Sequence, residues 1–241
     1  MKQHLLTYIT IGFVNFIYAQ KKTENQNLLW TRYSLEVKIN DQWQVKQELE
    51  ERTYWFPWRQ HQFLSRTLIN RKFNKGWNVS AGVTYFIQSL PHDPYVKKFT
   101  NNDEIRLQIE LGNKQKISDK FSIGHRYWSE FRFFEQSDSK FEFENIRMRY
   151  RLEFQYLLVN KITLKASDEI FLNIGNKITY NVFDQNRYGT SLQYMPLNDF
   201  GIEIGYINWF QQRKSGDEFY NRNIVRFTLH HNISFNKSKK T

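Results

Sequence analysis

One stretch of the chain alternates charged and apolar side chains, and this spacing is the strongest chemical signal in the sequence. The charged positions are Arg147, Arg149, Arg151 and Glu153, and the apolar ones are Met148, Tyr150, Leu152 and Phe154. In an extended strand, successive side chains point to opposite faces. The stretch therefore predicts a strand with one guanidinium-rich face and one apolar face. A row of guanidinium groups can pair with carboxylates or select anions.

The same alternation recurs along most of the chain and predicts eleven candidate strands. They cover approximately residues 28–39, 42–55, 61–73, 76–89, 103–113, 120–134, 142–157, 161–174, 183–195, 200–212 and 220–235. Short and long connections alternate between them, as the periplasmic turns and external loops of outer-membrane barrels do. Because single-chain bacterial barrels have an even number of strands, we expect an all-β, up-and-down antiparallel transmembrane β-barrel of about twelve strands. Ten strands is the alternative.

A soluble periplasmic barrel or sandwich would show the same alternation with its apolar face turned inward. Strands in globular proteins are typically about 5–6 residues long, whereas a tilted membrane-spanning strand needs about 9–11 residues. Most of the candidate strands exceed even the larger figure. An arginine facing lipid at the bilayer midplane costs about 2–4 kcal/mol, so three in a row would exceed what a stability of about 5–15 kcal/mol can absorb. We therefore expect the apolar faces to contact lipid and the charged faces to line the lumen.

Composition excludes several other classes of protein. The 241 residues contain no cysteine, which excludes disulfides, thiolate metal sites and cysteine nucleophiles. The net charge of +11 is interleaved along the strands rather than gathered in one patch, which disfavours a nucleic-acid partner. The same charge favours contact with anionic headgroups of membrane lipid, including lipopolysaccharide. Aromatic residues make up 17% of the chain, as expected for girdles at both membrane interfaces.

The N-terminus predicts export from the cytoplasm. Lys2 precedes the apolar stretch 5–16, and Ala19 is the small residue before the expected cleavage site of a signal peptide, residues 1–19. The alternative is a first transmembrane helix, which the short length of the stretch and the polar residues 21–26 disfavour. Cleavage would leave residues 20–241 as a single barrel domain in the bacterial cell outer membrane.

Several stretches, in order, resemble a known family. They are Arg126-Tyr127-Trp128-Ser129-Glu130-Phe131-Arg132, Arg147-Met148-Arg149-Tyr150-Arg151-Leu152, Asp168-Glu169-Ile170-Phe171-Leu172-Asn173, Phe183-Asp184-Gln185-Asn186-Arg187 and Gly205-Tyr206-Ile207-Asn208. Together they resemble the bacterial family catalogued as domain of unknown function 2490. The resemblance implies an outer-membrane β-barrel without an assigned activity. The alternating residues from Val225 to Phe235 also resemble the terminal strand that the barrel-assembly machinery recognises, although six residues follow Phe235.

Pairing consecutive strands as hairpins predicts a charged belt across the lumen. The turn positions predict the cross-strand pairs Glu130–Arg147, Arg126–Arg151, Arg149–Glu169, Glu153–Lys165 and Glu169–Arg187. The full belt consists of Arg126, Glu130, Arg132, Arg147, Arg149, Arg151, Glu153, Lys165, Glu169, Gln185 and Arg187. One hypothesis is that this belt constricts a narrow pore for small anionic solutes. The alternative is a structural or scaffold barrel whose belt residues satisfy one another and seal the lumen.

A lipid-acting outer-membrane hydrolase is the third hypothesis. His125 and Ser129 share one strand face, but four residues separate them, which is about 13 Å in a strand and too far for direct proton transfer. None of the six histidines belongs to a set spaced as metal ligands. We therefore name no catalytic residue and expect no metal site and no cofactor.

Overall fold

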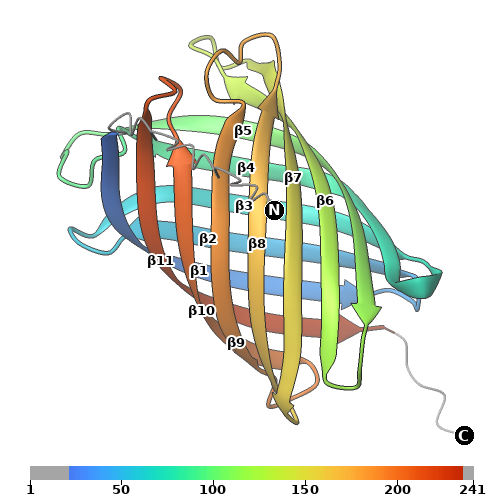
Figure 1. Ribbon diagram of the computed structural model, residues 1–241. Coiled ribbons are helices and arrows are strands. Elements are labelled where there is room, and N and C mark those ends of the chain that lie inside the picture. The colour runs from blue at the N-terminus through green and yellow to red at the C-terminus, as the bar shows by residue number, and fades with distance from the viewer. Residues whose placement is uncertain (1–21, 236–241) are drawn as a thin grey trace, which may run out of the picture.

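The alternating sequence forms eleven strands in the part of the chain that the computed structural model describes, residues 22–235 (Figure 1). These are β1 Lys22–Lys38, β2 Trp43–Tyr54, β3 Arg59–Lys72, β4 Trp77–Leu90, β5 Thr100–Lys116, β6 Phe121–Glu135, β7 Phe141–Val159, β8 Ile162–Ile174, β9 Phe183–Tyr194, β10 Phe200–Gln212 and β11 Glu218–Ser234. A single turn of 3-10 helix, η1 Asn74–Gly76, joins β3 to β4. The expected signal peptide and residues 236–241 lie outside the described part of the chain.

Over residues 22–235, no helix is both long and apolar enough to cross a membrane.

The strands close into a barrel in which each strand pairs with its sequence neighbour (Figure 1). All of these neighbouring pairs are antiparallel. The barrel closes where β1 pairs with β11 in parallel along its whole length, from Lys22 opposite Glu218 to Lys38 opposite Ser234. The all-β, up-and-down barrel expected from the sequence is therefore confirmed, and only its closing pair is parallel.

Residues 22–235 contain eleven strands instead of the twelve expected, and they coincide with the eleven segments that alternation marked. The expectation of an even number assumed an antiparallel closing pair. When an up-and-down barrel has an odd number of strands, its first and last strands run in the same direction. Parallel pairing also satisfies the backbone donors and acceptors of both edges, so the barrel closes without a twelfth strand.

The two ends of the barrel differ in their connections. Short connections at one end, the turn side, are residues 39–42, 73–76, 117–120, 160–161 and 195–199. Connections at the other end, the loop side, are residues 55–58, 91–99, 136–140, 175–182 and 213–217. The two longest, 91–99 and 175–182, both lie on the loop side, which matches the alternation predicted from the sequence.

The faces of the strands are oriented as the charge pattern predicts. On β7, Met148 is 39% exposed, whereas Arg147 is 7% and Arg149 is 8% exposed. Apolar side chains on the other strands are exposed on the same outer surface, among them Val83, Leu107, Ile109, Ile170, Ile204 and Phe227. The outer surface is therefore apolar and the interior is charged, which is the reverse of a soluble barrel.

Most, but not all, of the predicted cross-strand pairs are correct. Glu130 lies opposite Arg147, and Arg126 opposite Arg151, between β6 and β7. Glu169 lies opposite Arg187 between β8 and β9.

The predicted register between β7 and β8 is wrong by two residues. Arg149 lies opposite Phe171, and Glu153 lies opposite Ser167. The hairpin turns at residues 160–161 with Lys161 in the left-handed region (φ 70°), and a bulge lies between Leu157 and Val159. Because the shift is an even number of residues, every side chain keeps its predicted face.

The orientation of the outer face can be tested with Ile109, which is 54% exposed near the middle of β5. We expect Ile109→Arg to lower the free energy of unfolding in lipid vesicles by about 2–4 kcal/mol, because the charge would lie near the bilayer midplane. The measurement is guanidinium-induced unfolding followed by tryptophan fluorescence. Ile117→Arg, on the turn-side connection, is the depth control and should cost only about 0–1 kcal/mol. Equal costs at the two positions would contradict this orientation.

Candidate functional site

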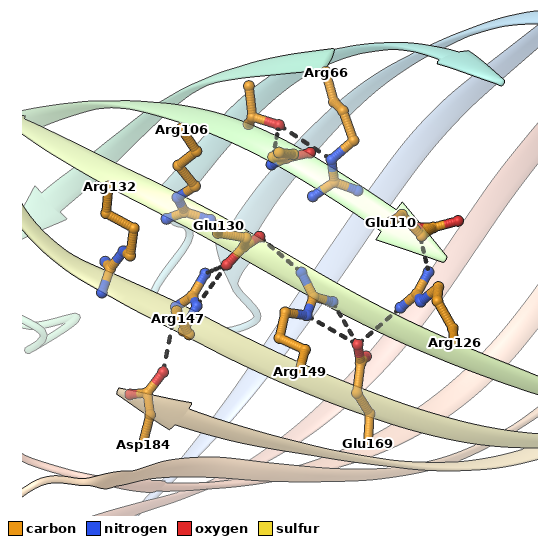
Figure 2. Close-up of polar contacts among 12 residues, drawn as sticks. Arg66, Arg106, Glu110, Arg126, Glu130, Arg132, Arg147, Arg149, Glu169 and Asp184 are labelled. Atoms are coloured by element: carbon orange, nitrogen blue, oxygen red, sulfur yellow. Dashed lines mark hydrogen bonds and ion pairs between the residues drawn. The ribbon is translucent and has the colours of Figure 1, made fainter. Parts of the chain in front are cut away.

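Two buried glutamates and three arginines form the centre of the charged belt. Figure 2 shows Glu130 between Arg147 and Arg149, and Glu169 between Arg149 and Arg126. Glu130 accepts from Arg147 Nη2 at 2.5 Å and from Arg149 Nη1 at 2.9 Å. Glu169 accepts from Arg149 Nη2 at 2.7 Å and from Arg126 Nη2 at 2.8 Å. Arg149 therefore links the two carboxylates into one network.

Further carboxylates extend this network around the lumen. Arg147 Nη1 lies 3.3 Å from Asp184 on β9 (Figure 2). On β5, which pairs with β6, Glu104 accepts two bonds from Arg106, both 2.7 Å long, and two from Arg132, at 2.5 and 3.0 Å, in a group of its own. One carboxylate thus holds two guanidinium groups, in the bidentate geometry that gives the strongest charge-assisted hydrogen bonds.

Aromatic rings fill the space between the ion pairs. The guanidinium carbon of Arg149 lies 4.0 Å from the ring centre of Trp128 and 4.4 Å from that of Phe171. On β2, the guanidinium of Arg52 lies 3.8 Å from the ring of Trp30. Guanidinium groups stack favourably on aromatic faces, so the belt is a packed layer of rings and ion pairs.

The side chains at the centre of the belt are closely packed. Glu130 is 0% exposed, and both of its arginine partners are buried. Trp128 and Phe171 are buried in the same layer. Little solvent therefore reaches Glu130 and the groups that contact it.

The loop-side half of the lumen is also filled. His61, Tyr54 and Arg222 are buried there. The connection 91–99 folds against them, since Gln26 on β1 donates to the carbonyl oxygen of His92 at 2.7 Å. Burial and the nearby Arg222 lower the pKa of the His92 imidazole to about 3, so this ring is neutral at physiological pH.

The turn-side half contains a cavity of about 770 Å³. Its lining runs from side chains near the turn-side rim, such as Lys72 and Gln193, to the belt residues Arg147 and Phe171. Ten arginines and four lysines line the cavity, against seven glutamates. The cavity is therefore positively charged and ends at the belt.

The structure brings only some of the predicted belt residues into one network. Arg126, Glu130, Arg147, Arg149 and Glu169 are linked directly.

The other predicted residues lie on the inner face with different partners. Arg132 binds Glu104, and Arg151 pairs with Glu153 on its own strand. Lys165 binds Glu203 at 2.7 Å instead of Glu153, as a consequence of the shifted register. Gln185 is buried on β9, and neither of its amide atoms has a hydrogen-bond partner in the described part of the chain.

Arg187 differs from all of these residues. It lies opposite Glu169 in the register, but Glu169 binds Arg126 and Arg149 instead. Within residues 22–235, Arg187 has no carboxylate partner and contacts aromatic rings.

Sequence reasoning missed an important part of the network. Glu48, Glu50 and Arg52 on β2, together with Arg66 on β3, form a second group of ion pairs, with Arg66 Nη1 2.7 Å from Glu48. Alternate spacing along residues 48–52 was the available signal. The buried rings, such as Trp128, were missed because apolar residues were all expected to face outward, although Trp128 has the same strand parity as Glu130.

The residues considered for hydrolysis do not meet. His125 Nδ1 lies 2.9 Å from the hydroxyl of Tyr150, and Ser129 Oγ lies 3.2 Å from Met148 Sδ. Both partners lie on the outer face of β7. For residues 22–235, no group of three or more His, Asp or Glu side chains is placed to hold a metal ion.

Comparison with solved structures identifies the class of fold. The structure is similar to the NanC porin, with a TM-score of 0.51 and 11% sequence identity over 84% of this chain and 96% of that chain. A second solved structure, OmpT, an outer membrane protein of Vibrio cholerae, has a TM-score of 0.38 and 16% identity over 74% of this chain and 55% of that chain. The first similarity shows that the chain has the barrel fold of a porin.

The sequence itself identifies the family. Residues 27–220 match the family described as protein of unknown function (DUF2490), and the chain belongs to this family. This confirms the resemblance seen in the sequence. No curated protein matches the chain.

The network predicts a stability cost for removing its central carboxylate. We expect Glu130→Gln to lower the free energy of unfolding by about 3 kcal/mol, because two buried guanidinium groups lose their shared carboxylate. This cost is at the low end of the range for breaking a buried ion pair, because Arg147 still pairs with Asp184 and Arg149 still pairs with Glu169. Unfolding by guanidinium in lipid vesicles measures the change.

Glu142→Gln is the matched control for this prediction. Glu142 lies on β7, next to the strand of Glu130, and is exposed, so its substitution should change stability by less than about 0.5 kcal/mol. If Glu130→Gln were as stable as Glu142→Gln, the belt would not depend on its central ion pairs.

Proposed function

We propose that this protein is a bacterial outer-membrane β-barrel whose lumen is closed at rest and whose cavity opens toward the periplasm. The exposed apolar side chains of the outer face, such as Ile109 and Leu107, support the membrane location, because so large an apolar surface is unfavourable in water. The porin fold supports the same location. In outer-membrane barrels the short turns lie on the periplasmic side, which gives the direction of the cavity. Insertion by the barrel-assembly machinery through β11 stays a prediction.

The burial of the belt carries this proposal. Glu130 is completely buried, and Arg149 joins it to Glu169 across neighbouring strands. An ion could pass only if these pairs separated, and a separated buried charge is costly. Of the two hypotheses for the belt, the sealed barrel therefore has the stronger support.

A narrow pore for small anionic solutes is the second candidate. The observation that favours it is the excess of Lys and Arg over Glu in the cavity lining, since rings of positive side chains select anions. For this function the belt would have to open while a solute passes.

Conductance in planar lipid bilayers distinguishes the two functions. We expect the wild-type protein to give no conductance steps, and the double variant Trp128→Ala/Arg149→Ala to open a measurable pathway. This variant removes one of the large rings of the layer and the arginine that bridges Glu130 and Glu169. The reason is steric, because the side chains that fill the lumen at this level would be gone.

Lys72→Ala is the control, since Lys72 is an exposed residue near the turn-side rim and lies outside the belt. It should remain closed. Steady, anion-selective conductance of the wild-type protein would contradict the closed lumen and favour the anion pore. A double variant that stays closed would show that the belt is not the seal.

A further inference from the structure

Arg187 is the exception among the arginines that line the cavity. Nine of the ten have a carboxylate oxygen within 4.0 Å: Arg32, Arg52, Arg66, Arg106, Arg126, Arg147, Arg149, Arg151 and Arg226. No carboxylate of the described residues lies this close to Arg187. Buried or half-buried charges are usually paired, so its environment needs a separate explanation.

Three aromatic rings hold the guanidinium of Arg187. Its central carbon lies 4.6 Å from the ring centre of Trp209, 4.8 Å from that of Phe171 and 5.3 Å from that of Trp30. Rings can hold a guanidinium by its faces but do not replace hydrogen-bond acceptors for its N–H groups. Its Nε is buried, and no acceptor from residues 22–235 contacts it. Its Nη atoms make no hydrogen bond to residues 22–235 either, so their N–H groups remain available to another partner.

The charges around Arg187 favour an anion. Arg52 contacts the Trp30 ring that also holds Arg187. Arg147 and Arg149 contact the Phe171 ring that holds it as well. Three further positive side chains therefore lie around Arg187, against the single carboxylate of Glu169 opposite it on β8. The turn-side part of the cavity also carries positive charge. Lys114 lines it and donates to the amide oxygen of Gln155 rather than to a carboxylate. A cleft lined by one sign of charge concentrates solutes of the opposite sign.

We propose that Arg187 is the recognition residue of a binding site for a small organic oxyanion, a carboxylate or a phosphate ester, that enters from the turn side. A guanidinium fork held by rings matches the planar, bidentate geometry of these groups. The cavity of about 770 Å³ falls within the usual size range of small-molecule sites. This inference rests on the proposed function for the side from which the ligand enters.

The test is calorimetric titration of the folded full-length protein in detergent micelles at constant ionic strength. The probes are glucuronate for the carboxylate, glucose 6-phosphate for the phosphate, and glucose as the uncharged control. We expect saturable binding of at least one charged probe and none of glucose. Comparison of the two charged probes shows which oxyanion the site prefers.

Substitution of Arg187 decides whether this residue recognises the anion. We expect Arg187→Met to weaken binding by about tenfold or more, because a charge-assisted hydrogen bond is lost. Arg187→Lys should bind with intermediate affinity, since it keeps the charge without the planar fork. Lys120→Met is the matched control, because Lys120 is exposed on the turn-side connection 117–120 and does not line the cavity; it should stay within about twofold of the wild-type Kd.

Three results would overturn the proposal: no saturable binding of either charged probe by the wild type, equal binding of glucose, or unchanged affinity in Arg187→Met. If Arg187→Met does not fold, as judged by its heat-dependent gel mobility, unchanged affinity in Arg187→Lys overturns it instead. Tryptophan emission gives a second readout, because Trp30 and Trp209 contact Arg187. The bilayer measurement is separate: conducting wild-type protein would contradict the closed lumen and leave the binding result intact.

Discussion

The neutralisation of guanidinium groups inside a narrow barrel is the constraint on which the rest of this structure depends. An apolar outer face turns most arginines of the alternating strands inward, where arginine and lysine outnumber glutamate by two to one along the cavity. Several carboxylates therefore pair with more than one cation. Glu130 holds two arginines, and Glu203 holds Lys165 and Arg226.

Aromatic rings also stabilise the guanidinium groups, which outnumber the carboxylates. Trp128 contacts Arg66, Arg126 and Arg149, and it is almost completely buried. Rings stabilise a cation without adding a charge, so they allow close packing where further glutamates would repel one another. This packing buries the side chains at the centre of the belt. It also explains how Arg187 can remain without a carboxylate partner.

Much of this architecture follows from the sequence. Alternation marked all eleven strands and gave the faces of β7 correctly, because side-chain direction in a strand depends only on position along the strand. The tight connections placed Glu130 opposite Arg147. The β7–β8 register failed because the chain turns at residues 160–161, with Lys161 in the left-handed region, farther along the chain than the prediction assumed. The even strand number failed because it assumed that the last pair must be antiparallel.

The sequence by itself determined which side chains face inward, since a period of two residues is a local property of each strand. Only the tertiary structure decided which of these side chains meet. Ion pairs inside the lumen depend on register, on closure and on the direction that each long side chain takes, and none of these is a property of a single strand. Arg187 shows the difference: its inward direction was predictable, but the preference of Glu169 for Arg126 and Arg149 was not. That choice leaves one guanidinium among rings at the closed end of a positively charged cavity.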